Sequence, residues 1–159
     1  MESGRGVRRT DNGQSLVELA LTLPILLAII MGIVDVGFVL YASSQVSAAS
    51  YEGARAGSLF AASLADPVVQ NDSSREQVVK LAVTGAMGRL DTGNSQNFVQ
   101  STDVVVTYDP SIPSGSWSTR SGDSVVVTVR YRQPVWFSIL PSISNNRFQV
   151  GGTSRVRIE

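Results

Sequence analysis

Cysteine and histidine are both absent from this 159-residue sequence. Their absence excludes disulfides, thiol chemistry, thiolate or imidazole metal sites, and catalytic triads that depend on histidine. The sequence also lacks a Gly-rich phosphate loop and a nucleophile with a plausible base. Acid pairs such as Asp103 and Asp109 could meet in a fold, but such pairs arise by chance in most domains. We therefore expect no enzyme, no cofactor and no metal site.

An excess of charge of one sign is lacking as well, since 13 basic and 13 acidic residues give a formal net charge of zero. No segment concentrates lysine and arginine strongly enough to attract the phosphates of a nucleic acid. We therefore expect no nucleic acid partner.

What the sequence does contain is a long apolar run near its start. Residues 19–40 amount to 22 positions, or about 33 Å of helix, which is long enough to span a bilayer. Asp35 opposes insertion by about 2.5 to 3.5 kcal/mol, while each of the 14 Leu, Ile, Val and Phe residues in the run returns roughly 0.3 to 0.6 kcal/mol. The sum predicts insertion. Arg5, Arg8 and Arg9 make the preceding segment mildly basic, so we expect a cytoplasmic amino terminus.

An ordinary secretory signal is the alternative interpretation of this run. Residues 42–44 or 46–48 would then serve as the cleavage region. That interpretation does not explain Glu18, a carboxylate at the start of the apolar run. If a peptidase cut after Gly13, the new amine of Gln14 could pair with Glu18 on the same chain or on a neighbour. Otherwise Glu18 is a helix-start glutamate that reaches the headgroups and favours the positive end of the helix dipole.

Three segments resemble TadE-like proteins, the pilin-like components of the tight adherence (Flp-type, type IVc) pilus system. They are residues 13–24 (GQSLVELALTLP), 32–37 (GIVDVG) and 48–55 (AASYEGAR). The resemblance implies cleavage by a prepilin peptidase between Gly13 and Gln14, which leaves Glu18 as the fifth mature residue, the position used for assembly. It also implies that Pro24 and Asp35 are family features of the membrane segment. The type IV pilin pattern often has Phe after the glutamate, where this chain has Leu, a conservative departure.

The remaining sequence predicts a small α+β domain. The resemblance implies a prepilin-type leader at 1–13, and we expect it to be followed by a transmembrane and stem helix at 14–62 and an extracytoplasmic domain at 63–159. A break at 66–67 precedes a capping box at 73–76, which opens a second helix that runs to about residue 90. Runs at 103–108, 124–133 and 148–158 predict strands, because alternate residues of the middle run are apolar. We expect the second helix to pack on a roughly three-stranded antiparallel sheet.

Small residues recur every fourth position on the stem helix, at Ala49, Gly53, Gly57 and Ala61. They align on one face and permit close backbone approach. That face packs either against the sheet of the same subunit, which we favour, or against a neighbouring subunit.

Two segments connect the predicted strands of the domain. Residues 109–122 predict an exposed loop of unknown ligand, because prolines and glycine are interspersed with serines. Residues 133–141 form an apolar patch bounded by prolines and including Trp136. The patch either caps the core, which we favour, or touches the membrane surface or another subunit.

The resemblance thus implies a minor pilin or pseudopilin of a Tad pilus, assembled through its amino-terminal helix. It would lie in the bacterial inner membrane with a single span, with incorporation into a surface pilus left open. The implied partners are a prepilin peptidase, other pilin-like subunits and the inner-membrane assembly platform. The alternative is a single-pass anchored extracytoplasmic binding domain that does not polymerise. The sequence does not distinguish a major pilin, a minor pilin and a membrane-retained assembly factor.

Overall fold

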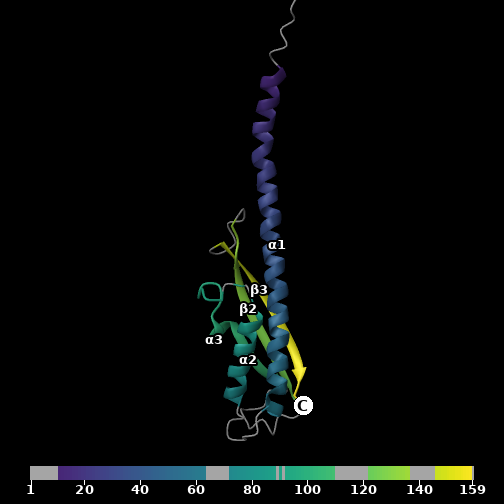
Figure 1. Cartoon of the computed structure of the whole chain (residues 1–159), viewed down its shortest axis with the longest axis vertical. Coiled ribbons are helices and arrows are strands. Elements are labelled where there is room, and N and C mark those ends of the chain that lie inside the picture. The colour runs from purple at the N-terminus through teal and green to yellow at the C-terminus, as the bar shows by residue number, and fades with distance from the viewer. Residues whose placement is uncertain are drawn as a thin grey trace, which may run out of the picture.

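One helix dominates the molecule. The computed structural model describes residues 11–63, 72–88, 90, 92–109, 122–136 and 146–158. Within them α1 (Asp11–Ser63) is a single long helix, and only its carboxyl-terminal half lies beside the rest of the chain (Figure 1). Most of the predicted leader, the break at 66–67, most of the 109–122 loop and the later part of the apolar patch lie outside the described residues.

The domain beside α1 is built from two further helices and one sheet. They are α2 (Asp72–Ala86), the short α3 (Gln100–Asp103), β1 (Val104–Asp109), β2 (Ser124–Pro134) and β3 (Arg147–Arg157). The strands form an antiparallel sheet in the order β1-β2-β3. This arrangement confirms the predicted α+β fold.

The second helix ends earlier than predicted. The sequence predicted a helix to about residue 90, yet α2 ends at Ala86. Met87 N still donates to Val83 O at 3.0 Å, and Gly88 then adopts a left-handed φ of +58°. Glycine takes up this conformation at no steric cost and commonly ends helices in this way. Gly88 was therefore the stop signal, and the turn residues after residue 90 were not.

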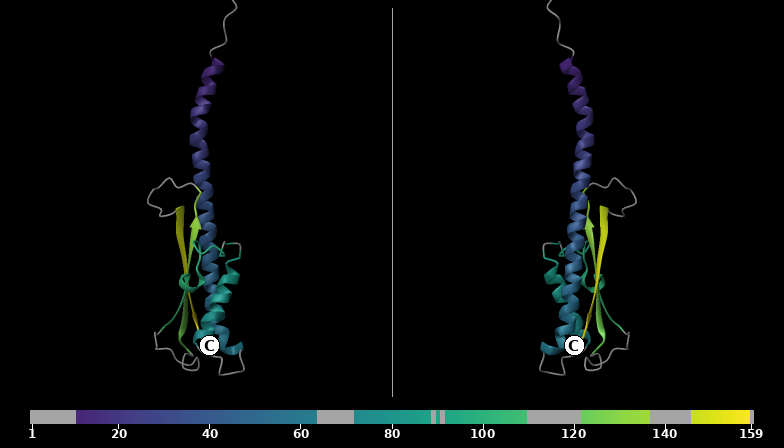
Figure 2. Two further views of the ribbon diagram at one scale, coloured as in Figure 1. Left: turned by 90° about the vertical axis from the view of Figure 1, so that its left-hand side faces the viewer. Right: turned by 90° about the vertical axis from the view of Figure 1, so that its right-hand side faces the viewer.

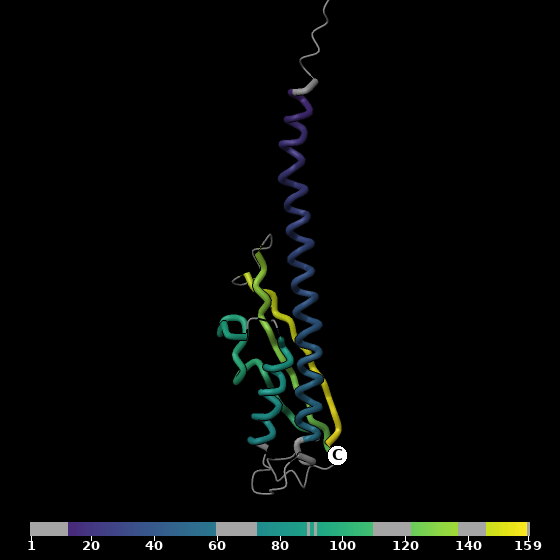
Figure 3. Tube along the Cα trace, viewed as in Figure 1, coloured from purple at the N-terminus to yellow at the C-terminus, as the bar shows by residue number. Residues whose placement is uncertain are grey.

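The core lies between the sheet and the two longer helices. Figure 2 shows α1 and α2 on the same side of the sheet. The strand β2 crosses the middle of this core, and its alternate side chains Val125, Val127, Val129 and Tyr131 are buried, as the period-two pattern predicted. They meet Val46 and Ala49 of α1 and Val79 and Val83 of α2 in one buried cluster. The carboxyl-terminal half of α1 is thus part of the domain, while the other half extends beyond it as a single rod (Figure 3).

Candidate functional site

The half of α1 that extends beyond the domain is apolar on every side. Of residues 13–41, Asp35 alone is buried. Val39 is partly buried against the core. The other large apolar side chains of this half are between 43% and 68% exposed, which in water would be unfavourable: Leu16, Val17, Leu19, Leu21, Leu23, Ile25, Leu26, Leu27, Ile29, Ile30, Met31, Ile33, Val34, Val36, Phe38, Leu40 and Tyr41. A helix that is hydrophobic all round requires apolar surroundings. The helix is long and apolar enough to cross a membrane, which suggests a membrane anchor.

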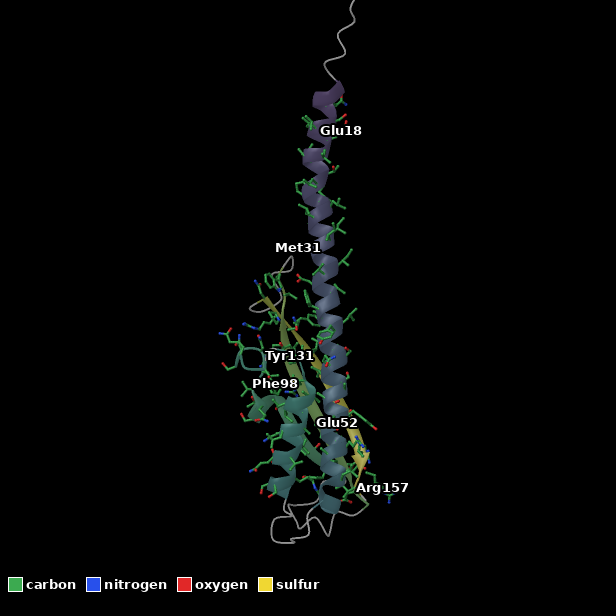
Figure 4. The ribbon with its side chains drawn as sticks, viewed as in Figure 1. Glu18, Met31, Glu52, Phe98, Tyr131 and Arg157 are labelled. Carbon is green, nitrogen blue, oxygen red and sulfur yellow. The ribbon has the colours of Figure 1, made fainter. Side chains whose placement is uncertain are left out.

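Glu18 lies near the tip of this rod, far from the domain (Figure 4). Gln14 Nε2 donates a hydrogen bond to Glu18 Oε1 at 3.2 Å, because positions four apart share one face of a helix. The hydroxyl of Thr22, one turn further along the helix, donates to the carbonyl oxygen of Glu18 at 2.9 Å. Both the side chain and the main chain of Glu18 thus have a partner on the same helix.

The predicted cleavage position lies in the first turn of the same helix. Gly13 and Gln14 follow the helix start at Asp11, and a side chain added at Gly13 would meet nothing within 4 Å. The first amide groups of a helix have no intrahelical partners, and helix ends fray. The Gly13–Gln14 peptide bond is therefore accessible and can leave the helix at the loss of few hydrogen bonds.

The two other candidate residues of the apolar run lie at different heights on the rod. Pro24 lies inside α1, where it lacks the N–H that would bind the carbonyl of Ala20. Asp35 is 8% exposed, and its Oδ1 accepts a hydrogen bond from the main-chain nitrogen of Trp136 at 3.2 Å. Glu18, Pro24 and Asp35 therefore do not form one site. They are spaced along a single helix, and Asp35 joins that helix to the end of β2.

Trp136 corrects the prediction that the apolar patch caps the core. Its side chain is 82% exposed. The reason is that β2 ends at Pro134, so the chain has passed the end of the sheet when it reaches Trp136. Val135, also in the patch, is half-buried. Phe137, Ile139 and Leu140 lie outside the described residues, so the correction concerns Trp136.

The small-residue face of α1 packs within the chain. Ala49 is buried in the core cluster. A Cβ at Gly53 would lie 2.5 Å from Val83 Cγ2, and one at Gly57 would lie 2.8 Å from Val79 Cγ2. These glycines let α2 approach α1 closely, so their face is occupied by the chain's own domain. The side chain of Ala61 lies outside the described residues.

Sequence reasoning missed a close approach of the sheet to the main chain of α1. A Cβ at Gly152 of β3 would lie 2.9 Å from both Ser47 Cα and Val46 O, which are main-chain atoms of α1. Next to this contact, the hydroxyls of Ser50 and Ser154 are 2.9 Å apart and join the helix to the strand. The pair Gly151-Gly152 was the available signal, since glycine inside a strand marks close backbone approach.

The two carboxylates considered as an acid pair lie at opposite ends of β1. Asp103 is buried, and its oxygens accept two hydrogen bonds from Arg132, each of 3.0 Å. Asp109 forms an ion pair with Arg155 at 2.7 Å. Each carboxylate thus has its own arginine. No group of three or more acidic or metal-binding side chains suited to a metal ion occurs among the residues that the structure describes.

Two hollows border the end of the sheet nearest the apolar rod. One, of about 1,090 Å³, is lined mainly by polar side chains, among them Gln96, Arg132 and Arg147. The other, of about 740 Å³, lies between α1 and β2 and is lined by Phe38 and Tyr131 among others. Neither hollow contains the carboxylate, nucleophile and base that a hydrolytic site would require.

Comparison with known proteins bears on the amino-terminal part of the chain. No curated protein and no solved structure matches this chain. The sequence model of the family described as TadE-like protein matches residues 13–55. The match covers the apolar rod, Glu18, Pro24 and Asp35, and ends within the half of α1 that packs on the domain. It confirms the resemblance seen in the sequence and implies association with the Tad pilus system, so the amino-terminal segment of this chain is TadE-like.

Proposed function

We propose that this chain is a pilin-like structural subunit, a minor pilin or pseudopilin, of a Tad (type IVc) pilus. The observation that carries the proposal is the apolar rod of α1 with Glu18 near its tip. The rod exposes apolar side chains over most of its surface and therefore requires lipid, or equivalent helices of neighbouring subunits, around it. A lone anchor also needs lipid, and in it Glu18 would only reach the headgroups at the positive end of the helix dipole, whereas in a pilin-like subunit the same carboxylate also has a partner amine to bind.

Processing by a prepilin peptidase would complete the assembly surface. Cleavage between Gly13 and Gln14 creates an amine at position 14, and Gln14 already shares a helix face with Glu18, as their side-chain hydrogen bond indicates. The amine is a cation within reach of the Glu18 carboxylate of the same chain or of a neighbour. In a low-dielectric environment such a pair is strong and favours one register between subunits.

In this proposal the amino terminus faces the cytoplasm and the domain lies outside the inner membrane. The mildly basic segment before the rod supports that orientation. The partners are the prepilin peptidase, other pilin-like subunits and the inner-membrane assembly platform. We propose no catalytic role, because Asp103 and Asp109 are each held by an arginine and do not form an acid pair.

The first experiment measures the intact mass and amino-terminal sequence of the membrane-extracted protein, produced with and without the cognate peptidase. A chain that begins at Gln14 only when the peptidase is present supports the proposal. A chain that begins at Met1 in both conditions indicates an anchored domain that is not processed. A chain that begins beyond Leu40 indicates an ordinary secreted protein.

The second experiment compares two charge-removing substitutions on the same helix. Glu18→Gln should abolish incorporation into pili, or pilus formation itself, because the carboxylate that would bind the amine is lost. Glu52→Gln is the matched control, since Glu52 is exposed at the level of the domain and forms only a surface ion pair with Arg55 at 3.8 Å. Equal pilus yields from both variants, measured by immunoblot of sheared surface fractions, would contradict the role assigned to Glu18.

A further inference from the structure

The end of β2 is fixed to α1 at one defined height. The hydrogen bond from the main-chain nitrogen of Trp136 to Asp35 joins residues 101 positions apart in the sequence. It holds the Trp136 main chain beside α1 at the level of Asp35. The depth of Asp35 in a membrane therefore sets the depth of Trp136.

This inference rests on one part of the proposed function, namely that α1 spans a bilayer. The depth of Asp35 then follows from its spacing from Glu18. Asp35 follows Glu18 by 17 residues, or about 26 Å of helix. The hydrocarbon core of a bilayer is about 30 Å thick. With Glu18 at one surface, Asp35 thus lies within a single helical turn of the other surface, and any tilt of the helix moves it deeper. Trp136 is then at the boundary between hydrocarbon and headgroups.

The side chains at this height suit such a boundary. Trp136 is largely exposed, and Phe38 and Tyr41 are exposed on α1 three and six residues beyond Asp35. Tryptophan and tyrosine are enriched where a membrane meets water, because one end of each ring system is apolar and the other is polar. We call Trp136, Phe38 and Tyr41 the aromatic band. In water these rings would expose a large apolar area without a partner.

A cation lies at the same end of the sheet. Arg147 of β3 pairs with Pro134 of β2, two residues before Trp136. Its guanidinium donates to Asn97 Oδ1 at 3.1 Å and to Gln96 Oε1 at 2.6 Å, and both of these acceptors are neutral amide oxygens. Among the residues that the structure describes, no carboxylate forms an ion pair with Arg147. Its positive charge therefore suits the phosphates of a headgroup layer.

We propose that the aromatic band seats the β2 end of the domain in the headgroup region of the leaflet on the domain side of the membrane. The partner of this surface is lipid. Trp136 contacts the lipid directly, and the Asp35 bond holds it there. The domain is therefore in contact with the bilayer and does not merely hang from α1.

Depth-dependent fluorescence quenching tests this proposal on the full chain in phosphatidylcholine vesicles. Trp117→Phe leaves Trp136 as the sole tryptophan. The control carries Trp117→Phe, Trp136→Phe and Tyr51→Trp, which places the sole indole at an exposed position 16 residues, or about 24 Å, beyond Asp35. We expect phosphatidylcholine brominated near the headgroup end of its chains to quench Trp136 and not the control. Aqueous iodide should quench Trp136 several-fold less than the control.

Three results would overturn the inference. Strong iodide quenching of Trp136 with no effect of brominated lipid would place the indole in water. Protection from both quenchers that increases with the protein-to-lipid ratio would place a second copy over it. In both cases flotation of the vesicles with the protein shows that α1 is inserted, so the proposed function is unaffected. A protein that does not float with the vesicles would overturn the membrane anchoring and this inference together.

Discussion

The two halves of α1 differ both in their residues and in their surroundings, since the first is rich in leucine, isoleucine and valine and the second in alanine and serine. Val36, on the rod, is 59% exposed, whereas Val46, ten residues later, is fully buried against the domain. Exposed positions of the second half carry polar residues such as Ser44, Glu52 and Arg55 beside two large apolar ones, whereas exposed positions on the rod are mostly leucine, isoleucine and valine. The difference teaches that the residues on the outer face of a helix indicate whether water or an apolar medium surrounds it.

The largest expected effect comes from a substitution that forces the sheet away from the second half of α1. Gly152→Ala should destabilise the domain by about 3 kcal/mol, since the new methyl group would collide with main-chain atoms of α1, which cannot rotate aside. Gly151→Ala is the matched control, because a Cβ there would lie 3.6 Å from Val129 O, an ordinary contact. Thermal unfolding of the detergent-solubilised chain, followed by near-ultraviolet circular dichroism, measures both. Equal effects would contradict the close approach.

A second prediction compares the effect of a valine-to-alanine substitution on the free energy of unfolding in the two halves of α1. Val46→Ala should destabilise the domain by about 2 kcal/mol, because it removes two buried methyl groups and leaves a cavity. Val36→Ala should change the free energy of unfolding by less than about 0.5 kcal/mol, since its side chain is exposed and is not part of the buried cluster. Urea titration of the same preparations gives the two values. A large loss from Val36→Ala would mean that the rod also supports the domain.

The smallest expected effect concerns the polar bridge beside Gly152. Ser50→Ala should cost about 1 kcal/mol, because the half-buried hydroxyl of Ser154 loses its partner on α1. Replacing both serines by alanine should cost less than twice that amount, because neither hydroxyl is then left without its partner. A double-mutant cycle of unfolding free energies checks the coupling, and strictly additive losses would argue against the bridge.

Local patterns explain why much of the fold could be predicted. The apolar run without a helix-ending signal predicted α1, and the alternation at Val125, Val127 and Val129 predicted β2 and its buried face. The family pattern at 13–55 identified Glu18, Pro24 and Asp35 as candidates. Each of these features depends on residues close together in the sequence.

What could not be predicted depends on pairs far apart in the sequence. The contact of Gly152 with Ser47 and the bond between Asp35 and Trp136 follow from how β3 and β2 cross α1, which no local pattern encodes. Trp136 was assigned to the core because its neighbours are apolar, yet the end of β2 decides its exposure. The end of α2 was misplaced for a local reason, because Gly88 was not recognised as a helix stop.

The unbroken course of α1 has a geometric consequence. Beyond Pro24 no proline or other break separates the rod from the half that packs on the domain, so the two halves rotate about the helix axis as one rigid body. Each residue along a helix corresponds to about 100° of rotation and 1.5 Å of advance. A contact that fixes the rotation of Glu18 about the helix axis therefore also fixes the direction in which the sheet faces. Inserting one residue between Pro24 and Asp35 would rotate the domain about this axis by about 100° and leave its interior unchanged.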